Sequence, residues 1–106
     1  MIVSPGATVA GHRVVKTFGL VKGNTIRARH MGKDILAGLK SLIGGEIEEY
    51  TKMIAESREQ CLDRMAEEAR SVGADAVICV RFSTSSMMQG AAELLAYGTA
   101  VKLADE

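Results

Sequence analysis

The sequence predicts an α+β domain, in which a small antiparallel or mixed β-sheet is covered by a short and a long helix. Three observations support this class. A segment rich in β-branched residues comes first, two amphipathic helical patterns follow it, and two further strand patterns end the chain. A chain of 106 residues is one domain by length, so residues 1–106 are expected to form a single unit without internal repeats.

The first predicted strand covers residues 13–26 (RVVKTFGLVKGNTI). Gly19 suits a β-bulge, and Gly23 with Asn24 suits a turn that would divide the segment into two short strands. A short helix is expected over residues 32–43 because apolar residues recur there at helical spacing. These residues are Ile35, Leu36, Leu39, Leu42 and Ile43.

The second helix is predicted over residues 46–72, and Gly73 is expected to cap it. Its apolar stripe consists of Ile47, Tyr50, Ile54, Cys61, Met65, Ala69 and Val72, and a flanking strip consists of Met53, Leu62 and Ala66. At 1.5 Å per residue the helix would be roughly 40 Å long. A compact domain of this size is only about 33 Å across. The excess length and the second strip predict contact with another copy of the chain.

Two strand patterns follow the long helix. Residues 74–82 (ADAVICVRF) form a nearly unbroken apolar run, which is typical of a strand buried on both faces. Residues 83–90 (STSSMMQG) are predicted to form a polar loop. The alternation in residues 94–103 (LLAYGTAVKL) then predicts a half-buried strand, antiparallel to the preceding one.

Composition excludes several classes of protein. Hydrophobic residues make up 47% and charged residues 25% of the chain, as in soluble globular proteins. The longest wholly apolar stretch, residues 76–80, is too short to span a membrane, and no secretory signal pattern is present. Two distant cysteines do not suggest a disulfide framework, so a reducing cytoplasmic location is expected. Zero net charge and 4% aromatic residues disfavour a nucleic-acid-binding protein.

The charges are unevenly distributed along the chain. Residues 1–45 hold seven Lys or Arg and one acidic residue, whereas residues 46–72 hold eight acidic and four basic residues. This asymmetry is compatible with an acidic helix that lies near a basic surface of the same or a neighbouring subunit. Two solvated faces that never meet explain it equally well.

Three motifs together resemble the YbjQ family of small bacterial and archaeal proteins. They are KDILAGLKSLIGGEIEEY at residues 33–50, ARSVGADAVICVRF at residues 69–82 and YGTAVKL at residues 97–103. The resemblance covers essentially the whole chain and implies a homopentameric ring associated with heavy-metal binding. Two positions depart from the family pattern: Asp75 stands where asparagine is common, and Cys79 stands where a small residue such as glycine is common.

Heavy-metal binding requires thiolate, imidazole or thioether ligands in a closed cluster. The candidate ligands are Cys61, Cys79, His12 and His30, together with six methionines. None of them forms a local chelating motif. Both cysteines lie among apolar residues, which favours core positions over metal ligands. A ring could still place one ligand from each subunit around its axis.

The alternative to a metal is a small anion. Arg27, Arg29, His30 and Lys33 cluster before a predicted helix N-terminus, where free N–H groups favour phosphate or carboxylate. No P-loop accompanies them, and a solvated basic loop explains the same residues.

No set of nucleophile, base and orienting group is recognisable, so no enzymatic activity is expected. The sequence therefore predicts a homo-oligomeric cytoplasmic binding protein, with a heavy-metal ion as its implied ligand. An anion-binding ring and a structural or adaptor ring without a small-molecule site are the alternatives.

Overall fold

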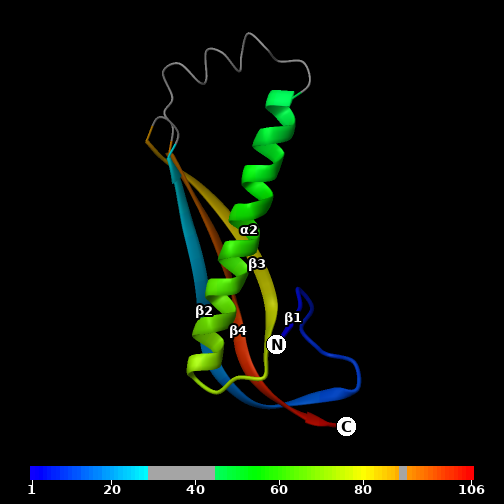
Figure 1. Cartoon of the computed structure of the whole chain (residues 1–106). Helices are drawn as coiled ribbons and strands as arrows, with labels where there is room; N and C mark the ends of the chain where they lie inside the picture. The colour runs from blue at the N-terminus through cyan, green and yellow to red at the C-terminus, as the bar shows by residue number, and fades with distance from the viewer. Residues whose placement is uncertain (29–44, 89–90) are drawn as a thin grey trace.

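The computed structural model describes residues 1–28, 45–88 and 91–106 of the chain. Within these residues, one long helix packs on one face of a four-stranded sheet (Figure 1). The elements are β1 (Ile2–Val3), β2 (His12–Ala28), α2 (Gly45–Ser71), β3 (Ala76–Met88) and β4 (Ala91–Asp105). The strand order is β1-β3-β4-β2. The expected α+β class is confirmed, and the predicted short helix at residues 32–43 lies outside the described residues.

Strand β2 is continuous, so the turn predicted at Gly23 and Asn24 is wrong. Both residues pair with β4, Gly23 opposite Ala96 and Asn24 opposite Leu95. The long partner strand supplies hydrogen bonds along the whole segment, and this tertiary pairing overrides the local preference of Gly-Asn for a turn. The bulge predicted at Gly19 is confirmed, because the register shifts there and Gly19 has a φ of 115°.

Strand β3 is longer than the sequence predicts. Residues 83–88 continue the strand, so the loop predicted from residue 83 is wrong over this part, and residues 89–90 lie outside the described residues. Ser83 and Thr84 pair with Leu95 and Leu94 of β4. Polar Ser and Thr side chains are compatible with an extended backbone when a neighbouring strand pairs with it. β4 is accordingly longer as well, from Ala91 to Asp105.

The short strand β1 was not expected from the sequence. It runs parallel to β3, with Ile2 opposite Ala76, and makes the sheet mixed. The following segment continues along the same edge, where the N–H of Val80 donates to the carbonyl of Ser4 (3.1 Å) and that of Cys79 to the carbonyl of Gly6 (3.0 Å). Two residues are too few for a sequence pattern, which explains why β1 was missed.

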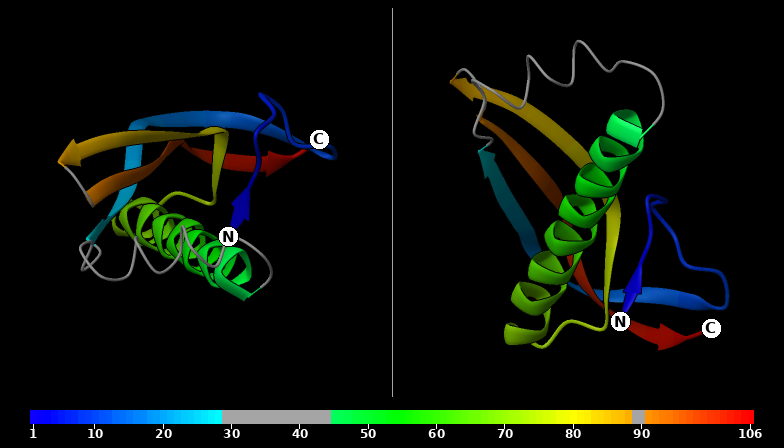
Figure 2. Two further views of the ribbon diagram at one scale, coloured as in Figure 1. Left: turned by 90° about the horizontal axis from the view of Figure 1, so that it is seen from above. Right: turned by 45° about the horizontal axis from the view of Figure 1, so that its top comes forward.

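Helix α2 matches the prediction within one residue at each end. α2 lies along one face of the sheet (Figure 2). Its buried face comprises Cys61, Met65 and Ala69, which are four residues apart and belong to the apolar cluster shared with the strands. Gly73 has a φ of 88° and donates to the carbonyl of Arg70, so the predicted cap is confirmed. The predicted stripe fails at Ile54 and Val72, which are 48% and 46% exposed. α2 has the length to cross a membrane but not the apolarity, and no helix in the described ranges has both.

Two apolar clusters lie on opposite faces of the sheet. The larger one, between sheet and helix, includes Ala100, and the smaller one includes Val101. Successive residues of a strand point to opposite faces, so the two clusters are separated by the sheet itself. Val9 of the N-terminal segment covers the smaller cluster.

Candidate functional site

Cys61 is a core residue whose thiol is already engaged. It is fully buried on α2, and its Sγ donates to the carbonyl oxygen of Leu94 (3.1 Å). The Oγ1 of Thr25 on β2 lies 3.5 Å from the same sulfur. A metal at this thiol would have to displace both partners and open the interface between helix and sheet. The structure therefore agrees with the core interpretation of this candidate ligand.

Cys79 occupies a different environment, in a bulge of β3. It is half-buried, has a φ of 56° and packs against the smaller cluster with Ile78 and Val101. Because Cys61 belongs to the larger cluster, the two cysteines lie on opposite faces of the sheet. One protomer therefore cannot join both thiols to one metal ion.

The backbone at Cys79 predicts an unusual order of stabilities. A φ near +56° costs about 1 kcal/mol for a residue with a Cβ and little for glycine. We expect Cys79→Gly to be more stable than Cys79→Ala by about 1 kcal/mol in chemical denaturation. At Ser83, an exposed position of the same strand, the Gly and Ala variants should rank in the opposite order. If the Gly and Ala variants had the same order of stability at both positions, this explanation of the bulge would be contradicted.

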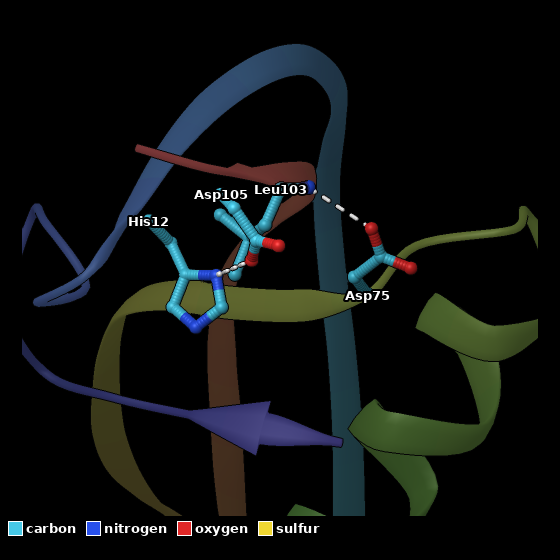
Figure 3. Close-up of polar contacts among 4 residues, drawn as sticks. All are labelled: His12, Asp75, Leu103 and Asp105. Carbon is cyan, nitrogen blue, oxygen red and sulfur yellow. Dashed lines mark hydrogen bonds and ion pairs between the residues drawn. The ribbon is translucent and has the colours of Figure 1, made fainter.

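His12 pairs with Asp105, at the end of the sheet away from the pairing of Met88 with Ala91. Its Nδ1 is 3.7 Å from the Oδ1 of Asp105, which is largely exposed (Figure 3). An exposed pair of this kind contributes little stability, and a lone imidazole beside one carboxylate is an incomplete metal site.

Asp75 has a structural role near this pair. Its Oδ2 accepts a hydrogen bond from the backbone N–H of Leu103 (3.0 Å) and lies 3.7 Å from the Nζ of Lys102 (Figure 3). The carboxylate thus extends the pairing of β3 and β4 beyond the last backbone bond. An asparagine at this position would offer the same acceptor oxygen.

This role predicts different effects for two substitutions of Asp75. Asp75→Asn keeps the bond from Leu103 and loses only the exposed ion pair, so stability should change by less than about 0.5 kcal/mol. Asp75→Ala removes the acceptor and should cost about 1 kcal/mol in thermal or chemical denaturation. Equal losses in both variants would show that the N–H bond is unimportant.

The structure does not test the candidate anion site. Arg27 lies on β2, and Arg29, His30 and Lys33 lie outside the described residues. In residues 1–28, 45–88 and 91–106, no three His, Cys, Asp or Glu side chains are grouped so that they could hold a metal ion. The described part of one protomer therefore does not offer a complete set of ligands for a heavy metal.

The most prominent surface was not singled out from the sequence. It is the sheet face opposite α2, where the exposed positions of β2 alternate with those that face the helix. Leu20 is 67% and Ile26 is 56% exposed on this face, and Lys22 and Asn24 lie between them. The register sets Lys22 beside Tyr97 of β4, which in turn pairs with Arg81 of β3. The alternation of residues 20–26 is the sequence pattern that could have revealed it.

In the described residues, one helix packed on one face of a four-stranded mixed sheet defines a small α+β domain. A family model described as "Putative heavy-metal-binding" (YbjQ) matches residues 1–104. The chain belongs to this family, as the resemblance of its motifs implied.

Relatives and a solved structure agree with this assignment. A UPF0145 protein of Dehalococcoides mccartyi is 62% identical over 101 residues, which cover 95% of this chain and 97% of the relative. One from Methanosarcina acetivorans is 55% identical over 103 residues, which cover 97% of both chains. A crystal structure of a DUF74 family protein of unknown function from Pediococcus pentosaceus has a TM-score of 0.66 at 14% identity. It covers 98% of both chains and supports the fold alone.

Proposed function

We propose that the chain is a subunit of a cytoplasmic homo-oligomer, a ring of five according to the family resemblance, that binds heavy-metal ions. The main support for an oligomer is the set of exposed apolar side chains on the sheet face opposite α2. Leu20 and Ile26 are largely exposed on this face, diagonal to half-buried Tyr97 and Leu95 of β4. Lys22 and Asn24 lie between them, so the face is mixed, and association with another subunit would cover its exposed aliphatic side chains.

The shape of the protomer supports the same proposal. Its radius of gyration is 17.4 Å and its extents are 56 × 24 × 16 Å. A compact domain of this length would have a radius of gyration of about 13 Å. A thin, elongated subunit buries little of its own apolar surface, and packing against further copies compensates for this.

Heavy-metal binding takes its support from the family description. The described residues of one chain lack a grouped set of ligands, so the proposal draws further donors from another copy or from residues outside the described ranges, such as His30. Cys79 and His12 are partly accessible, whereas Cys61 is closed off. Because Cys79 stands where the family resemblance implies a small residue, its thiol would be a ligand of this chain and not one shared by the family. Thiolate and imidazole together suit zinc, copper or cadmium.

Metal titration of untagged protein tests this function. We expect elemental analysis to find metal, and zinc, copper or cadmium to bind stoichiometrically to the assembled protein. Cys79→Ser should weaken binding at least about tenfold, because it removes a soft ligand. Cys61→Ser is the matched control, since its hydroxyl can replace the thiol in the bond to Leu94. Binding only above millimolar metal would refute the proposal.

The same preparation separates the alternatives. A thermal-shift hit with phosphates or nucleotides that disappears in a variant with Arg27→Ala and Arg29→Ala would favour an anion-binding ring. Empty metal and anion screens, together with one constant partner in pull-downs, would favour an adaptor ring.

A further inference from the structure

Within the described residues, no strand pairs with the outer edge of β3 over its distal half. β1 pairs only with Ala76 and Val77, and the N-terminal segment ends its contacts where Arg81 donates to the carbonyl of Pro5 (2.7 Å). From residue 82 to residue 88, β4 is the only described strand beside β3. Figures 1 and 2 show this half of β3 extending past β1.

An open strand edge normally carries features that prevent pairing with another chain, such as lysine, proline or a bulge. Residues 82–86 (FSTSS) contain no charge and no proline. Their register with β4 is regular, because the two shifts in β3 fall before Arg81 and after Ser86. Phe82 remains 43% exposed at this edge although it pairs with buried Ala96. An uncharged, regular edge with an exposed aromatic side chain is typical of a strand that pairs with another chain.

The opposite edge of the sheet, formed by β2, also has no strand beside it in the described residues, but it has a different character, and Arg64 of α2 donates a hydrogen bond to the carbonyl of Asn24 in this strand. β2 is the last strand on that side of the described sheet, and its residues 19–28 pair with β4 without a register shift. The whole strand carries Arg13, Lys16, Lys22 and Arg27 and no acidic residue. Two β2 strands placed side by side would therefore bring like charges together, which is unfavourable.

We infer that the distal edge of β3 (residues 82–86) pairs with the β2 edge (residues 19–28) of a second copy, which extends the sheet from one subunit to the next. This inference rests on the proposed homo-oligomer and names the surfaces that join it. Pairing of β3 with β3 would leave both β2 edges open, and charge opposes pairing of β2 with β2. Pairing of β3 with β2 covers both edges, sets a neutral strand beside a basic one and uses two different surfaces on each copy. Contacts between two different surfaces build a ring when the rotation from one copy to the next closes, and an open filament when it does not.

Substitutions of opposite charge at Ser83 test the inference. Ser83 pairs with Leu95, on the sheet face that also carries Lys22. In the extended sheet, Ser83→Lys adds a cation beside the basic β2 edge of the next copy and should raise the dissociation constant of the assembly roughly two- to fivefold. Ser83→Glu is the matched control, and it should leave that constant unchanged or lower it. Equal effects of lysine and glutamate would overturn the inference.

Amide hydrogen exchange of the wild-type protein gives a second test. In an uncovered edge strand only alternate N–H groups are bonded to the neighbouring strand, so protection should alternate along residues 82–86. Pairing on both sides instead protects consecutive amides, and dilution to the monomer should restore the alternation. An oligomer that shows alternating protection would refute the edge pairing while leaving the proposed homo-oligomer intact. A protein that stays monomeric at every concentration would instead refute the proposed homo-oligomer itself.

Discussion

Replacement of Gly23 by alanine is expected to lower the free energy of unfolding by about 3 kcal/mol or more. α2 crosses β2 so closely here that an added Cβ would lie 2.2 Å from the carbonyl oxygen of Cys61 and 2.5 Å from the nitrogen of Met65. Both are backbone atoms of a helix, so neither can rotate away. The whole helix would have to rise from the sheet, and the contacts of the core around it would be lost.

Chemical denaturation at a fixed protein concentration measures this loss, because the stability of an oligomer depends on concentration. Asp63→Ala is the matched control. It changes an exposed residue of α2 between Cys61 and Met65, away from the proposed interface, and should alter stability by less than about 0.5 kcal/mol. A Gly23→Ala protein with the wild-type midpoint would show that α2 does not pack on β2 as the structure places it.

Met65→Ala is expected to destabilise the protein by about 3 kcal/mol. Met65 is fully buried between helix and sheet, where it belongs to the larger cluster with Val77 and Ala96. Truncation removes three heavy atoms from this contact and leaves a cavity that the surrounding strands can fill only in part.

Two further variants separate the cavity from a general effect of mutation on α2. Met65→Leu nearly conserves volume and should cost less than about 1.5 kcal/mol. Glu67→Ala changes an exposed residue of the same helix and should be almost neutral. The midpoints of denaturation provide the comparison. If Met65→Ala and Glu67→Ala were equally stable, the described helix face would not be the buried one.

The long helix and the class of fold were predictable because their patterns are repeated over many residues. Cys61, Met65 and Ala69 recur at a helical spacing, and Gly73 suits the helix end. Strand ends were less predictable, since residues 83–88 look like a polar loop until β4 pairs with them. Gly23 and Asn24 resemble a turn for the same reason, and only the opposing strand shows otherwise.

The candidate site was predictable only in part. The sequence correctly favoured a core position for Cys61, because its apolar neighbours at helical spacing imply burial. It gave no indication that Cys79 has a positive φ or that the cysteines lie on opposite faces of the sheet, since both depend on a bulge and on tertiary register. Ligands from several copies could meet only through contacts between those copies, and local sequence patterns do not reveal such contacts.

The mass of the wild-type protein in solution tests the central proposal most directly. Light scattering at micromolar concentration should give a multiple of the 11.3 kDa chain mass, fivefold for the ring implied by the family resemblance. A particle of 11.3 kDa at these concentrations would contradict the account. The apolar sheet face opposite α2 would then need a partner other than this chain.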